Sequence, residues 1–208
     1  MNRENLYNIL MADDIRKSIR ENIKYILEEI PELCSLMSTQ HMHPHHIDGS
    51  IWDHVLLALK ISDGANNEYR RELSKEKVFD VRLALLFHDL GKTSSLYDKP
   101  DETGVKHYHG HATESARLAN FILQRMGFDI NYINYICYLI SYHDTPINDV
   151  SIDNNYDICE VLYEVQRCDA LAHHPDHLEK RKKYLSELKE KLDAYKQNKD
   201  NLITPKIS

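Results

Sequence analysis

The sequence has little glycine and proline and lacks the alternating β-branched runs of sheet proteins. Six residues of each type occur among 208. Turns between strands rely on glycine and proline, and half-buried strands rely on the alternation, so their scarcity argues against a sheet-based fold. Apolar residues recur at helical spacing from end to end instead, and the expected fold class is all-α.

Long hydrophobic runs are also missing. No apolar stretch approaches the ~20 residues that a membrane-spanning helix needs. Charges are scattered through residues 1–20, which leaves no apolar segment of the kind that a signal peptide requires. We therefore expect no membrane span and a cytoplasmic location.

Cysteine pairs and clustered positive charge are absent as well. None of the four cysteines forms a CxxC pair, which argues against a zinc ribbon or disulfide framework and favours reduced core thiols. They are Cys34, Cys137, Cys159 and Cys168. The formal net charge of −7 argues against nucleic-acid binding, because that binding relies on clustered Lys and Arg. A small phosphorylated ligand remains compatible with this charge.

Helical spacing predicts how the chain is organised. Its length suits one domain with a sizeable core. Seven helices are predicted, at residues 13–29, 52–63, 75–90, 112–126, 131–143, 154–172 and 176–198. A long loop, YDKPDETGVKHYHG, precedes the helix at 112–126, and loops of this length are often functional.

The last predicted helix carries an apolar stripe among lysines and glutamates. The stripe consists of Leu178, Leu185, Leu188, Leu192 and Tyr195. Docking of the stripe on the rest of the domain is favoured, with a homodimer contact as the alternative.

The stretch VRLALLFHDLGKTSSL, residues 81–96, places polar residues on an apolar helical face. His88 lies seven residues after Val81, and Asp89 lies four after Leu85, so both share a side with apolar neighbours. Burial of these groups is unfavourable unless they are paired or bound to something. The pattern therefore marks a candidate site.

Other helical segments repeat this arrangement. His143 lies seven residues after a buried-face isoleucine, Asp169 lies seven after a buried-face leucine, and His54 lies four before an alanine of its helix. His111 opens the helix that follows the long loop. Five helical segments thus offer side chains of the kind that bind metals.

Taken together, these side chains predict a metal site in the core. Any one of the histidines alone is more typical of an ordinary core or surface residue. Imidazole and carboxylate together suit iron, manganese, zinc or similar divalent ions. A shared ion would offset the desolvation of His54, His88, Asp89, His143 and Asp169 at once.

The same residues carry a resemblance to the HD-domain metal-dependent phosphohydrolases. The match runs in order through His54, HDLGK at 88–92, HYHGHATESARLA at 107–119, LISYHD at 139–144 and CDALAH at 168–173. It looks most like the HD domain on the C-terminal side of bacterial tRNA nucleotidyltransferases, where a stretch similar to QHMHPHHIDGSIWDH leads into the first ligand. No motif of the nucleotidyltransferase head precedes this region, so nucleotide addition to tRNA is not expected.

The resemblance implies a stand-alone HD-type helical bundle over residues 1–208 with the metal site in its core. The HD core would cover about 40–175, with a helical extension at 1–39 and an amphipathic helix and tail at 176–208. It also implies a divalent metal at His54, His88, Asp89 and Asp169. His111 and His143 match the positions that hold a second metal in binuclear members.

We therefore expect two divalent ions, drawn from Fe, Mn, Ni, Co or Zn, with Asp89 bridging them. An ion of this kind lowers the pKa of its bound water enough to supply hydroxide near neutral pH. The expected activity is that of a phosphatase or phosphodiesterase acting on a nucleotide or another small phosphoester. Asp89 and Lys92 are the expected catalytic residues.

Lys92 and three other residues are candidates for contacting the substrate. Lys92 lies three residues after Asp89, where its ammonium group could meet a phosphate, although a lysine there could simply complement the helix dipole. The HDxGK pattern of the family favours the substrate role. His109, Arg117 and His46 are further candidates, each of a type more often exposed to solvent.

The histidine-rich run before His54 is not expected to form a metal site of its own. Pro44 and the DGS at 48–50 prevent QHMHPHHIDGSIWDH from forming one helix, so its histidines cannot share a regular ligand face. Within the run, only His54 is predicted as a ligand.

Two other functions fit the same residues. A few HD-type proteins with this ligand set use two irons and oxygen to cleave carbon bonds. A non-catalytic sensor module that retains a nucleotide is the other alternative, although a binding module would not need every ligand.

Overall fold

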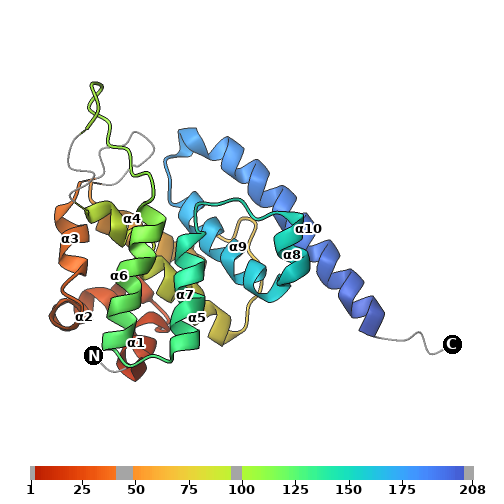
Figure 1. The fold of residues 1–208 in the computed structure, drawn as a ribbon, viewed down its shortest axis with the longest axis horizontal. Helices are drawn as coiled ribbons and strands as arrows, with labels where there is room; N and C mark the ends of the chain where they lie inside the picture. The colour runs from red at the N-terminus through yellow and green to blue at the C-terminus, as the bar shows by residue number, and fades with distance from the viewer. Residues whose placement is uncertain (1–2, 41–48, 95–99, 204–208) are drawn as a thin grey trace.

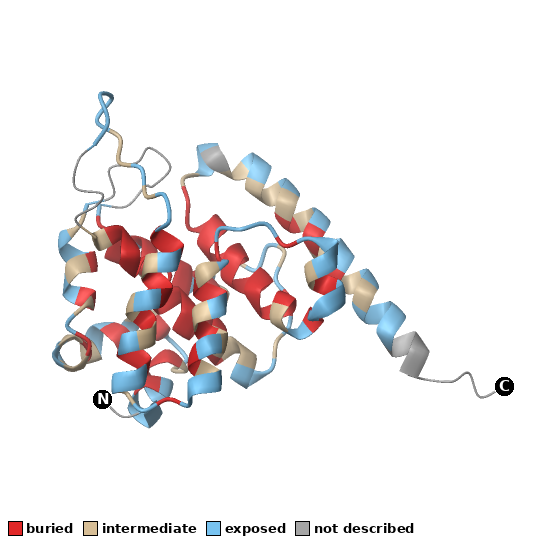
Figure 2. Cartoon of the chain, in the orientation of Figure 1, coloured by how far each residue is buried: buried red, intermediate tan, exposed pale blue. Residues whose placement is uncertain are grey.

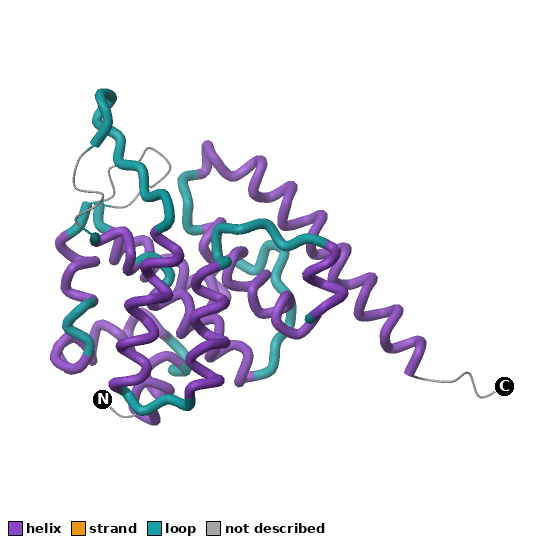
Figure 3. The backbone as a smooth tube through the Cα atoms, in the orientation of Figure 1, coloured by secondary structure: helices purple, strands orange, loops and turns teal. Residues whose placement is uncertain are grey.

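The computed structural model describes residues 3–40, 49–94 and 100–203. The regular elements within these ranges are all helical (Figure 3), apart from one isolated bridge between Gln40 and Ser50. The predicted all-α fold class is therefore confirmed.

The helices are arranged as a bundle with one long helix running out from it (Figure 1). The α-helices are α1 (Arg3–Leu10), α2 (Ile15–Glu29), α3 (Leu33–Ser38), α4 (Ile51–Lys60), α5 (Lys75–Phe87), α6 (His111–Arg125), α7 (Ile130–Ser141), α8 (Asp149–Asn154), α9 (Tyr156–Leu171) and α10 (Leu178–Ile203). A π-helical turn, η1 (Ile61–Ala65), follows α4, and 3₁₀ turns form η2 (Leu90–Thr93) and η4 (Pro175–His177).

Seven of these helices match the predicted ones, and the differences have simple causes. Helices α1, α3 and α8 were not predicted, because with eight, six and six residues they are too short to show a repeating apolar pattern. The helix expected to reach residue 90 ends at Phe87, because the chain tightens there into η2.

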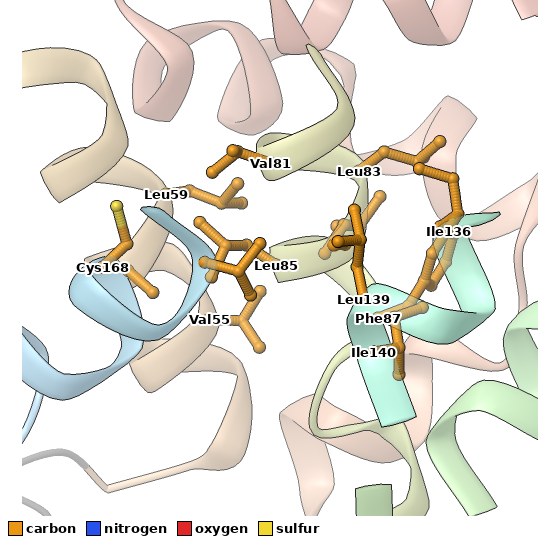
Figure 4. Close-up of a cluster of buried hydrophobic side chains, with 14 of the residues drawn as sticks. Val55, Leu59, Val81, Leu83, Leu85, Phe87, Ile136, Leu139, Ile140 and Cys168 are labelled. Atoms are coloured by element: carbon orange, nitrogen blue, oxygen red, sulfur yellow. The ribbon is translucent and has the colours of Figure 1, made fainter. Parts of the chain in front are cut away.

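Helix α5 lies at the centre of the bundle. An unbroken run from Val81 to Asp89 is buried, so the C-terminal part of α5 has no exposed side, and its one charged residue, Arg82, pairs with Asp63. In Figure 4, Leu85 lies among residues of α4 and α9, while Leu83 and Phe87 lie on the side of α7. A helical segment that is buried on all sides requires neighbours on all sides, which fixes the end of α5 inside the molecule.

Side-chain caps set where several helices begin. Ser50 caps α4: its hydroxyl accepts a hydrogen bond from the Asp53 backbone N–H at 3.2 Å, and the Asp53 carboxylate accepts one from the Ser50 N–H at 3.0 Å. This reciprocal capping box satisfies two backbone donors. It also places His54 about one turn into α4, on the buried side.

The apolar stripe of α10 packs against the chain's own core. Leu185, Leu188 and Leu192 are at most 2% exposed, and α10 contacts α9. Beyond the stripe, α10 extends away from the bundle and is largely exposed (Figure 2). The docked position predicted for this helix is confirmed for these leucines.

The expectations for membrane spans and cysteines have mixed outcomes. No helix in the described ranges is long and apolar enough to span a bilayer.

All four cysteines are free, and Cys159 and Cys168 lie in the core as expected. Cys34 is exposed, which corrects the prediction for that residue, because it lies on the outward side of the unpredicted α3.

We expect Leu188→Ala to lower the free energy of unfolding by about 2–5 kcal/mol, because it leaves a cavity under a docked helix. Urea denaturation of the purified protein measures this change. The matched control is Glu187→Ala on the exposed side of the same turn, for which the expected change is within about 0.5 kcal/mol. Equal effects of the two substitutions would contradict the docked position of α10.

Candidate metal centre

The six predicted metal ligands come together from five segments. His54 is on α4, His88 and Asp89 follow the end of α5, His111 opens α6, His143 follows α7, and Asp169 lies in the last turn of α9. None of the six is more than 9% exposed. The structure therefore gathers side chains that are up to 115 residues apart in one buried cluster.

Gly91 allows η2 to approach the first turn of α6. A Cβ atom at this position would lie 2.3 Å from the His111 carbonyl oxygen and 2.7 Å from the Ser115 backbone nitrogen. The Gly91 N–H also donates a hydrogen bond to the Ser115 hydroxyl at 2.8 Å. Only glycine permits this approach, which places His111 beside Asp89.

Four of the residues form the first group of the cluster. Asp169 Oδ1 lies 2.9 Å from His54 Nε2 and 3.5 Å from His88 Nε2. Asp89 Oδ2 lies 3.4 Å from His88 Nε2 and 3.8 Å from His54 Nε2. Two carboxylate oxygens and two imidazole nitrogens thus converge on one small volume.

The second group shares Asp89 with the first. Asp89 Oδ1 lies 3.3 Å from His111 Nε2 and 3.9 Å from His143 Nε2. One oxygen of this carboxylate therefore faces each group, which is the arrangement that the expected bridging role of Asp89 requires.

Backbone carbonyls fix the tautomers of three histidines. The Nδ1 atoms of His88, His111 and His143 lie 2.7–2.8 Å from the carbonyl oxygens of Leu85, Tyr108 and Ile140. Each carbonyl is three residues earlier in the chain. A carbonyl can only accept, so each Nδ1 carries a proton, and in its neutral form each ring therefore presents the lone pair of Nε2 to the cluster. Metal-bound histidines in proteins are usually oriented in this way.

The contact between His111 and His143 fits a cation. Their Nε2 atoms are 3.2 Å apart. In the neutral rings both nitrogens carry lone pairs, and two lone pairs at this distance repel each other. Nitrogens that share one ion at ~2.0–2.1 Å lie about 3 Å apart, so the observed spacing suits two donors to a single divalent ion.

The charges of the cluster also suit a metal site. Burial alone would raise the pKa of Asp89, but the positive charges of His88 and Lys92 hold it well below the ordinary value. The pKa of Asp169 is also well below its ordinary value, because the interaction with His173 and the hydrogen bond with His54 outweigh burial. Burial lowers the pKa of His143 to about 4, so its ring stays neutral near pH 7. The two carboxylates and the His143 ring are thus in the protonation states that bind a metal, whereas Asp89 and Asp169 raise the pKa of His88 against the effect of its burial.

Lys92 lies at the edge of the cluster. Its ammonium group donates a hydrogen bond to Asp89 Oδ2 at 2.8 Å and lies 5.5 Å from the centre of the Tyr108 ring. The side chain is buried, but it reaches the pocket that opens over the cluster.

This pocket has a volume of about 460 Å³. Its walls come from the loop before α6, the turn after α7, the end of α9 and the start of α10. They are formed by Lys92, His107, Tyr108, His109, Gly110, His111, His143, Asp144, Asp169, His173 and Arg181. The cluster is therefore accessible to a small ligand from one side.

The predicted substrate contacts have different outcomes. His109 lines the pocket, as a substrate contact requires. Arg117 does not: it lies on the exposed side of α6, where its guanidinium pairs with Glu114 at 2.6–2.8 Å. The i, i+3 spacing of these two residues favours that pair over the pocket. His46 lies outside the described residues.

Two further residues that the sequence pattern did not predict lie at the site. His173 is buried, and its Nδ1–H donates a hydrogen bond to the carbonyl of Asp169 at 2.8 Å, four residues earlier. That spacing from a predicted ligand was the available signal. Arg181 stands three residues after Leu178 and four before Leu185. A charged residue at such a position in the apolar stripe was the available signal that its side chain faces the protein.

Comparison with protein families adds an independent finding. The family model for the HD domain matches residues 51–191, which is more than half of the chain and includes all six candidate ligands. A search of curated proteins finds no match.

We expect Gly91→Ala to lower the free energy of unfolding by about 1–3 kcal/mol or more, because the new methyl group collides with backbone atoms that cannot rotate away. Thermal and urea denaturation measure the change. Gly49→Ala is the control, since a Cβ there meets its nearest atoms at 3.5 Å and 3.9 Å, ordinary contact distances. A Gly91→Ala protein as stable as this control would refute the close approach of η2 and α6.

Proposed function

The chain belongs to the HD-domain family, and on that premise we propose that it is a phosphohydrolase that acts on a nucleotide or another small phosphoester. HD domains are in general metal-dependent hydrolases. One observation carries the proposal most directly: histidine Nε2 atoms with fixed lone pairs converge on two buried carboxylates beneath an open pocket.

We propose that the cluster holds two divalent ions. His54, His88, Asp89 and Asp169 would hold the first, and Asp89, His111 and His143 the second. Such ions supply a bound water of lowered pKa and polarise a phosphoryl oxygen. Hard carboxylate and borderline imidazole donors together suit Fe, Mn, Ni, Co or Zn.

Lys92 is proposed to bind the phosphoryl group that reacts. Its ammonium group already neutralises part of the Asp89 charge and reaches the pocket wall. An additional cation beside the cluster offsets the negative charge that a phosphoester brings and orients its oxygens. Asp89 takes part because each of its two oxygens faces one group of donors, which keeps the two groups next to each other. His109, at the pocket rim, is proposed as a further substrate contact.

Lys92 also favours the hydrolase over the alternative functions. A buried ammonium group next to the metal donors suits an anionic substrate. A phosphoester always brings that charge to the reacting group, whereas a di-iron oxygenase would use the lysine in this way only for an anionic substrate. Closeness to the HD domains of tRNA nucleotidyltransferases remains part of the proposal, as do a single HD-type domain, a cytoplasmic location and a substrate that is not a nucleic acid.

The first experiment is a panel of phosphoesters tested with Mn²⁺, Fe²⁺, Ni²⁺ and Co²⁺. We expect turnover of at least one nucleotide or small phosphoester, and we expect His88→Ala to lower kcat/KM at least about 100-fold. Loss of a direct donor should exceed the 10- to 100-fold effect typical of residues that only orient donors. The control is His174→Ala, because His174 lies outside the cluster and pairs with Asp176.

Four results would reject the proposal, two from the panel and two from separate measurements of oxygen uptake and nucleotide retention. Absence of turnover with every metal, or equal rates for His88→Ala and the native protein, would remove the hydrolase assignment. Oxygen uptake by the reduced iron-loaded protein would favour the oxygenase instead. Nucleotide retained without product after metal loading would favour the sensor.

The second experiment measures metal content per chain by elemental analysis. We expect two ions in the native protein, about one in His143→Ala, and neither in Asp89→Ala, because Asp89 serves both groups of donors. His174→Ala should retain both. A native content of one ion that neither His111→Ala nor His143→Ala changes would rule out the second metal.

A further inference from the structure

Arg181 occupies an unusual position on α10. The docked side of this helix follows the three- and four-residue steps of Leu178, Arg181, Leu185, Leu188 and Leu192. Four of these residues are leucines, and the three C-terminal ones are buried. A guanidinium in this row carries a charge toward the body of the protein, which is unfavourable unless the charged end has water or an anion as a partner.

The side chain of Arg181 lines the pocket over the metal cluster. It is half-buried, and within the described ranges it forms no ion pair or hydrogen bond. The buried arginines behave differently, since Arg71, Arg82 and Arg167 each pair with a carboxylate. Arg181 is thus a cation on a pocket wall that forms no ion pair with a carboxylate of the described chain, while Asp144 and Asp169 lie elsewhere in the lining of the same pocket.

The two cations of the pocket therefore differ in their surroundings. Lys92 is held by Asp89 within the cluster, where the reacting phosphoryl group would bind. Arg181 comes from α10, a different wall, next to the end of α9. A volume of about 460 Å³ is in the range of pockets that take ligands much larger than a single phosphate. The pocket has room for a second charged group.

We propose that Arg181 binds a second anionic group of the substrate, separate from the phosphoryl group at the metal cluster. This role of Arg181 rests on the proposed function, and it defines the substrate class as phosphoesters that carry a further phosphate or a carboxylate. A planar guanidinium can hold either group through two parallel hydrogen bonds, so Arg181 would be a specificity-determining residue rather than part of the hydrolytic machinery.

The test compares ligands with one and two anionic groups. AMP provides one phosphate, while ADP, adenosine 3′,5′-bisphosphate and 3-phosphoglycerate add a phosphate or a carboxylate at different positions. Their affinities for the Mn²⁺-loaded protein are measured by calorimetry, and kcat/KM is measured for those that are hydrolysed. The phosphate and carboxylate probes together identify which second group is accepted.

We expect the native protein to prefer at least one probe with two anionic groups over AMP by about 10- to 100-fold, the range for hydrogen bonds to a charged group. Arg181→Gln should abolish this preference while leaving AMP within about threefold, and Arg181→Lys should restore part of it. Lys180→Gln is the matched control, because Lys180 is the exposed neighbouring cation on the same helix. It should keep the full preference.

Two results would overturn the role of Arg181: equal affinity of the native protein for AMP and all three larger probes, or a preference that persists in Arg181→Gln. Failure of the hydrolase proposal is distinguishable from both. A protein that binds the probes but hydrolyses none rejects the proposed function, and the affinity comparison still decides whether Arg181 binds a second anion.

Discussion

The structure depends on a single carboxylate buried where five segments meet. Asp89 is inaccessible to solvent, and its two oxygens face different pairs of histidines, while Lys92 donates to one of them. A charge in that position is tolerated only with several partners. Helices α5, α7 and α9 end around the beginning of α6, and this brings those partners together. The bundle and the candidate metal centre therefore require the same arrangement of helices.

The orientation of the histidines comes from the ends of these elements. His88, His111 and His143 each follow a turn in which the carbonyl three residues earlier is available to accept the Nδ1 proton. Carbonyls in the last turn of a helix, or in the turn before one, lack the regular i+4 partner and remain able to accept another hydrogen bond. Two of the three also accept the backbone N–H of the histidine itself, at Tyr108 and Ile140. The turns at these helix ends therefore fix the rings that point into the cluster.

Periodicity was enough to predict the long helices and five of the clustered residues, because a polar side chain on an apolar helical side departs visibly from the pattern. His111 was predicted from its place at the start of a helix and from the family resemblance. Periodicity could not show that α5 would end at Phe87, since that depends on the contact of Gly91 with the backbone of α6. The sequence also suggested Arg117, which lies on the exposed side of α6, and did not by itself identify Arg181, which lines the pocket. Arg117 has a glutamate within reach on its own helix, whereas Arg181 stands in a row of leucines, and only the packing of α10 on α9 shows where that row leads.

Helix α10 has a second connection to the cluster through polar contacts. Tyr184 donates a hydrogen bond to Gln166 Oε1 at 2.7 Å, and Gln166 Nε2 donates to the carbonyls of Tyr142 and Thr145 at 2.9 Å and 2.7 Å. Those two carbonyls flank His143 in the turn that follows α7. The leucine stripe packs α10 against the core. Through Gln166, Tyr184 connects α10 to the turn that carries His143. Arg181 reaches the pocket from the same helix. A helix that looks like a peripheral addition in the sequence thus forms one wall of the pocket and supports the second group of candidate metal ligands.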